Sequence, residues 1–172
     1  MLLTCFGYRP TDRACQVKLI CVVKNDLDRV KCLIDYYRRL GVGHFIFLDD
    51  GSSDGTREYL LDQQDADVWC SDRSYSTDIR QAWINRLIDI YGFNQWYIVV
   101  DSDELITYPY CESVSLIDIT RNMAKQGYLQ AHCFMLDMYT CSGLFTASEK
   151  SDFTYECRYF DCDGYELRIE LS

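Results

Sequence analysis

The chain has 172 residues, of which 48% are hydrophobic and 15% aromatic. This length and composition predict one domain over residues 1–172 with a hydrophobic core, and they exclude a mainly disordered chain. The 27 acidic and 17 basic residues give a net charge of −10, which argues against nucleic acid as a partner because no general basic field is present.

Strand and helix signals alternate along the chain. The nearly continuous apolar run 17–23 predicts a strand that is buried on both faces, and 27–40 follows with apolar residues at helical spacing. The other predicted elements are strands at 45–48, 67–70, 96–100 and 128–138, and helices at 56–64, 78–91 and 113–125. This order predicts an α/β fold with a mostly parallel sheet and helices that cover it.

Polar clusters follow three of the predicted strands. They are the sequence KND after the first strand, DDGSSDG after the second and DSDE after the fourth. Ligands of such sheets bind beyond the carboxyl ends of the strands. We therefore expect the three clusters at one edge of the sheet, and this edge is the candidate functional site.

Asp101 and Asp103 follow a buried strand and form a DxD motif. Two close carboxylates repel each other, and a divalent cation relieves this repulsion. Oxygen ligands without neighbouring His or Cys favour Mn²⁺ or Mg²⁺ over zinc. The motif therefore predicts a metal site, and the alternative interpretation is a solvated acidic turn.

The other two clusters have a ligand-binding and a structural interpretation each. Asp50 could accept a hydrogen bond from the N–H group of a base or from a ribose, and the alternative is a well-capped strand–turn–helix connection. Lys24 and Asn25 precede a helix whose N-terminus is a predicted anion site, and the alternative is an ordinary surface pair.

Together these pieces resemble the family 2 glycosyltransferases of GT-A fold. The sequences VVKND, LGVGHFIFLDDGSSDGT and WYIVVDSDELITYP have the order and spacing of that family over about 17–109. They are most similar to a subgroup whose DxD motif continues into Glu-Leu. The resemblance implies a Rossmann-like GT-A sheet with helices on both faces, in which 17–109 binds the nucleotide sugar and 110–172 is a partial acceptor half.

The resemblance also implies the residues of the site. Asp101 and Asp103 would hold Mn²⁺ or Mg²⁺ against the diphosphate of the donor. Gln81 and Asn85, four residues apart on a predicted helix, resemble a Gln and an Asn of the subgroup, with plain surface residues as the alternative. The full set of donor-binding residues implied in this way is Val22, Lys24, Asn25, Asp50, Gln81, Asn85, Asp101 and Ser102.

The implied reaction is transfer of a sugar from a UDP- or GDP-sugar to a glycan, lipopolysaccharide or protein-glycan acceptor, with inversion. The metal would neutralise charge on the leaving nucleoside diphosphate, and a general base would deprotonate the attacking hydroxyl. Asp137 is the candidate base, and His132 is interpreted as a core or strand histidine. Further base candidates are Asp161, Asp163 and Glu166.

Two other functions stay open. A nucleotidyltransferase also uses paired carboxylates, but it would have a Gly-rich basic loop after the first strand, which the sequence KNDLDR lacks. A non-catalytic nucleotide-sugar-binding domain of a truncated transferase stays an alternative because no clear Glu-Asp base motif follows Asp103.

The sequence also bears on location. Its ten cysteines include no CxxC pair, which disfavours a zinc ribbon and indicates reduced thiols rather than a disulfide framework. The N-terminal apolar stretch is too short for a signal peptide, and no run approaches the ~18 apolar residues of a transmembrane helix. We therefore expect a cytoplasmic protein without a transmembrane segment, a location that includes the inner face of a membrane.

Overall fold

The computed structural model describes residues 2–6 and 17–138. The chain divides into two compact units, Met1–Leu129 and Gln130–Ser172, and every helix and strand of the described residues belongs to the first. None of the described helices has the length and apolar character needed to cross a membrane.

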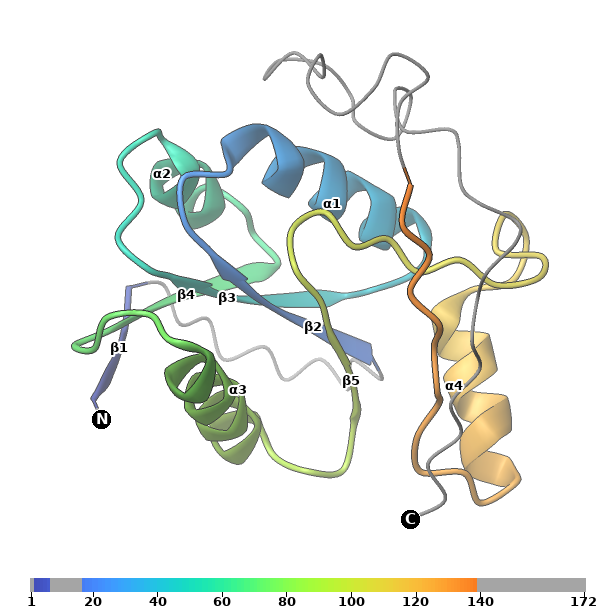
Figure 1. Ribbon diagram of the computed structural model, residues 1–172. Helices are drawn as coiled ribbons and strands as arrows, with labels where there is room; N and C mark the ends of the chain where they lie inside the picture. The colour runs from blue at the N-terminus through green and yellow to red at the C-terminus, as the bar shows by residue number, and fades with distance from the viewer. Residues whose placement is uncertain (1, 7–16, 139–172) are drawn as a thin grey trace. The chain divides into compact units, whose positions relative to one another are not determined.

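A five-stranded sheet forms the centre of the first unit (Figure 1). In spatial order its strands are β1 (Leu3–Cys5), β4 (Ala66–Ser71), β3 (His44–Asp49), β2 (Val17–Val23) and β5 (Trp96–Val99). The last four run parallel to one another, whereas β1 pairs with β4 in the antiparallel direction. The α/β class with a mostly parallel sheet is thereby confirmed, and the arrangement is consistent with a Rossmann-like sheet.

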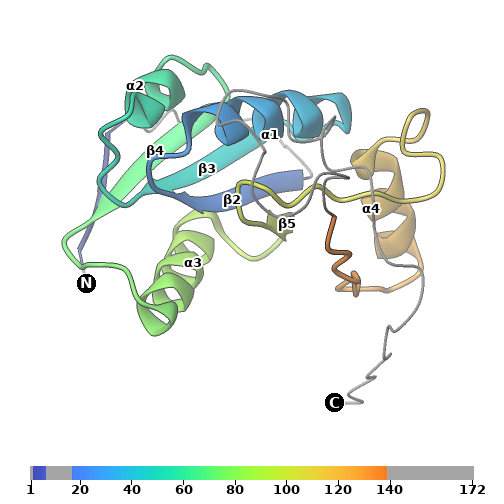
Figure 2. The same cartoon turned by 45° about the horizontal axis from the view of Figure 1, so that its top comes forward.

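Helices cover both faces of this sheet. Figures 1 and 2 show α1 (Leu27–Arg39) and α2 (Thr56–Leu61) on one face and α3 (Thr77–Tyr91) on the other. Because side chains alternate along a strand, Leu19 and Phe45 pack in the core under α1, whereas Ile20 and Ile46 pack with Trp83 of α3. A strand covered on both faces is mostly apolar, which explains the nearly continuous apolar run of β2, interrupted only by Lys18.

The element boundaries follow local chemistry. Helix α3 begins after Ser76, whose hydroxyl accepts a hydrogen bond from the backbone N–H of Ile79 (3.3 Å), so the cap is one residue earlier than Thr77. Helix α4 (Leu116–Lys125) is capped in the same way by Ser115 and begins later than expected from the sequence. Helix α2 ends at Leu61, which is earlier than the predicted end at 64.

The predicted strand at 128–138 is wrong for the described structure. These residues form no strand, and they extend across the division between the two units at residue 129. The apolar side chains of Leu129, Phe134 and Met135 are exposed. An apolar run becomes a strand only where a neighbouring strand accepts its backbone hydrogen bonds, and no such neighbour pairs with this segment among the described residues.

Candidate functional site

The carboxyl ends of β2, β3 and β5 bring the predicted polar clusters to one edge of the sheet. Strand β2 lies between the other two, and all three run in parallel. The backbone hydrogen bonding between these strands continues past their ends. The N–H of Asp50 donates to the carbonyl of Val23 (2.9 Å), and the N–H of Val100 donates to the carbonyl of Ile20 (3.2 Å). The expectation that these clusters share an edge is confirmed.

A hollow of about 320 Å³ lies at this edge and is lined by Val22, Val23, Lys24, Asp50 and Tyr75. Its volume is at the lower end of the range for ligand pockets, roughly 300–1,000 Å³. Tyr75 comes from the connection between β4 and α3, and its ring packs 6.2 Å from that of Trp83. The sequence analysis missed Tyr75, although its signal was present: an aromatic residue in the loop after a parallel strand.

Lys24 and Asp50 form an ion pair in the lining of the hollow, with Nζ 3.0 Å from Oδ2. The Lys24 side chain is 58% exposed and that of Asp50 is 13% exposed. Ion pairs of this kind contribute only ~0.2–1 kcal/mol, so a ligand can replace one partner at small cost. Both predicted binding residues therefore line the hollow, and a ligand can take the place of either one as the partner of the other.

The loop 50–56 also fixes the start of α1. The backbone N–H groups of Asn25, Asp26 and Leu27 donate to side chains of this loop at 2.8, 3.0 and 3.2 Å. The three acceptors are Ser52 Oγ, Thr56 Oγ1 and Asp54 Oδ2. These donors are therefore satisfied within the protein, and Asp54 adds a negative charge where the sequence predicted an anion site. The structural interpretation of this connection is the better one.

Asn25 is part of the same contact. It has a positive φ of 52°, and its side-chain oxygen accepts a hydrogen bond from the N–H of Ser53 (2.7 Å). Desolvation raises the pKa of Asp54, but hydrogen bonds from Thr56 and Leu27 outweigh it and hold that pKa below its usual value. Asn25 therefore has a structural contact, and its contact with the donor stays a prediction.

Helix α1 holds the acidic loop that follows β5. The Ser102 hydroxyl is buried and donates to Asp26 Oδ2, and the Asp101 N–H donates to Glu104 Oε2 (2.8 Å). Tyr37 donates to the Glu104 carbonyl (3.0 Å) and accepts from the Ile106 N–H (3.1 Å). Because burial raises the pKa of Tyr37, its hydroxyl stays neutral and available for both bonds. Ser102 thus orients the loop, and its donor-binding role stays a prediction.

Both carboxylates of the DxD motif are ion-paired with arginines. Arg80 of α3 places Nη2 2.5 Å from Asp101 Oδ1, and Arg29 of α1 places Nη1 3.8 Å from Asp103 Oδ2. The two Asp side chains are about half exposed. Sequence reasoning missed both arginines, whose signal is a basic residue in the first turn of each of two helices that begin at this edge.

The donor chemistry of Asp101 and Asp103 fits Mn²⁺ or Mg²⁺, which prefer carboxylate oxygens. In the described part of the chain, no group of three His, Cys, Asp or Glu side chains could hold a metal ion. Such ions are commonly held by one or two carboxylates, with water and substrate phosphates as the other ligands. The residues present therefore fit such a cation, with water or a phosphate-containing ligand as its other ligands.

The remaining predicted residues differ in their outcome. Gln81 and Asn85 share one face of α3, where Gln81 Nε2 donates to Asn85 Oδ1 (3.0 Å), but both are exposed and neither lines the hollow. Asp137 and His132 belong to the second unit and are exposed, so the interpretation of His132 as a core or strand residue is wrong. Asp161, Asp163 and Glu166 lie outside the described residues.

No protein-family model matches the chain, and no curated protein matches it.

Proposed function

We propose that this chain binds a nucleotide-diphosphate sugar at the carboxyl edge of its sheet and transfers the sugar to an acceptor hydroxyl. The observation that carries the proposal is the position of the acidic loop 101–104 beside β2, next to a hollow that contains Lys24, Asp50 and Tyr75. One side of this edge offers an aromatic ring and a hydrogen-bond acceptor, and the other offers two half-exposed carboxylates. A nucleoside diphosphate has a base that can stack on the ring and donate to the acceptor. At its other end it has a diphosphate that can share a cation with the carboxylates.

In this proposal the base occupies the hollow. It stacks on Tyr75 and donates an N–H to Asp50, while the diphosphate extends toward Asp101 and Asp103. Mn²⁺ or Mg²⁺ held by these two carboxylates would neutralise charge on the leaving nucleoside diphosphate. Lys24 supplies a positive charge between the two parts. UDP and GDP both present a base N–H to a carboxylate, so both are donor candidates.

The proposed acceptor is a hydroxyl of a glycan, a lipopolysaccharide or a protein glycan, and the proposed outcome is inversion. Asp137 remains the predicted base that takes the proton of this hydroxyl. The proposed location is the cytoplasm, with the inner face of a membrane included, and nucleic acid is not a proposed partner. Cys21, Cys70, Cys111 and Cys133 are free thiols, which agrees with a reducing compartment.

The proposal is tested by thermal unfolding with UDP, GDP, ADP and CMP, each with and without Mn²⁺. A ligand at 100 times its Kd adds about 2.7 kcal/mol of stability, which for a chain of this size raises Tm by roughly 5–10 °C. We expect UDP or GDP with Mn²⁺ to give a shift of this size and Asp50→Asn to reduce it. Asp89→Asn, an exposed change on α3, is the matched control.

Two results would contradict parts of the proposal. If neither UDP nor GDP raises Tm with Mn²⁺ present, the donor site is wrongly assigned. If a nucleotide raises Tm but no acceptor supports sugar transfer, the chain is a non-catalytic nucleotide-sugar-binding domain. The second function is kept because no clear base motif follows the DxD motif in the sequence.

A further inference from the structure

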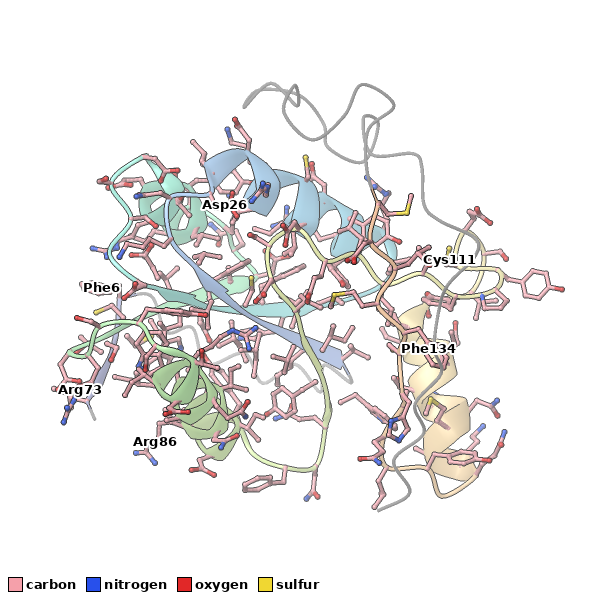
Figure 3. All side chains as sticks on the ribbon, viewed as in Figure 1. Phe6, Asp26, Arg73, Arg86, Cys111 and Phe134 are labelled. Atoms are coloured by element: carbon pink, nitrogen blue, oxygen red, sulfur yellow. The ribbon has the colours of Figure 1, made fainter. Side chains whose placement is uncertain are left out.

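The charges of the acidic loop are balanced by arginines from opposite faces of the sheet. Arg80 belongs to α3, which covers one face, and Arg29 belongs to α1, which covers the other (Figure 1). Arg80 contacts Asp101 at 2.5 Å. Arg29 lies between two carboxylates, 3.6 Å from Asp26 and 3.8 Å from Asp103. Figure 3 shows Asp26 at the start of α1, beside this loop.

These arginines stand where a cation and a diphosphate would both bind. A guanidinium group and a divalent cation repel each other, so the two compete for the same carboxylate oxygen. A guanidinium group is also a planar donor that matches phosphate oxygens well. The Arg29 contacts are long and half exposed, so the free energy that holds them is small.

We propose that Arg29 and Arg80 are exchangeable partners of the DxD motif. In the ligand-free protein they pair with Asp103 and Asp101, and when a divalent cation takes these carboxylates the two guanidinium groups turn to the diphosphate of the donor. This inference rests on the proposed function. It assigns both arginines to phosphate binding, a role that follows from neither the motif nor the helices alone.

The exchange predicts that removal of Arg80 changes the affinities for the cation and for the diphosphate in opposite directions. Removal of Arg80 eliminates the competitor for Asp101, so the cation should bind more tightly to the ligand-free protein. Removal of the same arginine deletes a phosphate contact, so the diphosphate should bind more weakly. Arginines that only stabilise the acidic loop would produce neither change in this direction. Cation and diphosphate binding should also strengthen each other in the wild type, because both use the same exchange.

The test measures Mn²⁺ binding to the nucleotide-free protein from the electron paramagnetic resonance signal of free Mn²⁺. For Arg80→Gln we expect the Kd for Mn²⁺ to fall about two- to fivefold, since an exposed ion pair of ~0.2–1 kcal/mol is lost. Arg29→Gln should change it in the same direction by less, because its distance to Asp103 is longer. Arg86→Gln, on the outer side of the same helix as Arg80 (Figure 3), should leave it unchanged.

Pyrophosphate with Mn²⁺ is the probe for the second half of the exchange. Isothermal titration should show weaker pyrophosphate binding to Arg80→Gln, by about fivefold or more, and unchanged binding to Arg86→Gln. Arg80→Lys keeps the charge without the planar donor, so it should bind Mn²⁺ as the wild type does and pyrophosphate with intermediate affinity. Far-ultraviolet circular dichroism and Tm establish that each variant is folded.

Two outcomes would overturn the inference. One is an unchanged or weaker affinity of Arg80→Gln for Mn²⁺, and the other is the absence of Mn²⁺ binding in both the wild type and Arg80→Gln. Neither result bears on the proposed function, which is tested separately by the rise in Tm with nucleotide. A protein whose Tm rises with UDP or GDP while its arginine variants bind Mn²⁺ like the wild type would retain the function and lose the exchange.

Discussion

Asp49 and Asp50 are adjacent in sequence but have opposite environments. Asp49 ends β3, is buried, and binds Arg57 Nε at 2.7 Å together with the backbone N–H groups of Gly51 and Ser52. Asp50 instead faces the hollow and contacts Lys24. Successive side chains of a strand point to opposite sides, so only one of the pair is available to a ligand.

Tyr75 is the residue whose contribution to nucleotide binding is easiest to isolate. Stacking of a base on an aromatic ring contributes ~1–3 kcal/mol, so Tyr75→Ala should weaken binding of the nucleotide that raises Tm by about 5- to 150-fold. Tyr75→Phe keeps the ring and should retain most of the affinity. Phe93→Ala removes an exposed aromatic side chain at the opposite end of α3 and should have no effect on a titration with this nucleotide.

Loss of affinity in Tyr75→Phe equal to that in Tyr75→Ala would contradict stacking and indicate a role for the hydroxyl. An unchanged affinity in Tyr75→Ala would place the base elsewhere on the sheet edge.

Asp54 links stability to pH. Its pKa in the folded chain is lower than its ordinary value of 3.8, so it stabilises the fold fully above that value and loses this contribution as the pH falls through the folded pKa. In Asp54→Asn this loss is absent. We therefore expect Tm to decrease less steeply between about pH 5 and about pH 3 in the variant than in the wild type.

Asp65 is the comparison for this pH dependence. Its pKa is also lowered, because hydrogen bonds from Arg38 outweigh desolvation, but it takes no part in the hydrogen bonds between loop 50–56 and the start of α1. Asp65→Asn should independently make the decrease of Tm over the same pH range less steep. The double variant should show the sum of the two effects on this slope. Equal slopes in the wild type and Asp54→Asn would contradict the assignment of Asp54 as a carboxylate acceptor in the folded chain.

At the scale of elements, helix α1 is the support of the whole site. Its N-terminus is held by loop 50–56, and near its C-terminus Tyr36 and Tyr37 bind the backbone beyond the DxD motif, where Tyr36 donates to the Ile106 carbonyl at 2.7 Å. The position of the acidic loop therefore depends on α1 as much as on β5. The loop and the hollow are adjacent because one helix fixes both.

Tyr37→Phe tests this support. The substitution leaves the Glu104 carbonyl and the Ile106 N–H without their partner, which costs about 1–3 kcal/mol of unfolding free energy in a urea titration. It should also lower the affinity for the nucleotide with Mn²⁺, because the loop is less well held. Tyr59→Phe on α2 is the control for loss of a tyrosine hydroxyl. Reduced stability with unchanged nucleotide affinity would show that α1 does not position the loop for binding.

The order of the elements from β2 to α4 and the shared edge could be predicted from the sequence because each depends on local patterns, whereas β1 was missed. Apolar runs fixed β2 and β3, and the rule for parallel sheets placed the polar clusters together. The partners of Asp101 and Asp103 could not be predicted, since Arg29 and Arg80 reach them only after α1 and α3 pack on opposite faces. The strand at 128–138 failed because a pattern of apolar residues does not contain its pairing partner.

At the scale of the whole molecule, the donor site and the candidate base belong to different units. Every residue of the hollow and both carboxylates of the DxD motif lie in Met1–Leu129, whereas Asp137 lies in Gln130–Ser172. A unit with its own sheet and core is expected to fold without the other. The fragment 1–129 should therefore bind the nucleotide with Mn²⁺ as the full chain does, with the same rise in Tm.

The same fragment should transfer no sugar if the base lies beyond residue 129. Asp137→Asn in the full chain should then reproduce it: an unchanged nucleotide affinity and a turnover reduced about 10²- to 10⁴-fold, the usual contribution of a general base. Sugar transfer and nucleotide binding are measured on the full chain, the fragment 1–129 and Asp137→Asn, which distinguishes a base in the second unit from a base in the first. Transfer by the fragment would exclude Asp137 and every other residue of the second unit as the base, and it would direct the search to carboxylates beside the hollow.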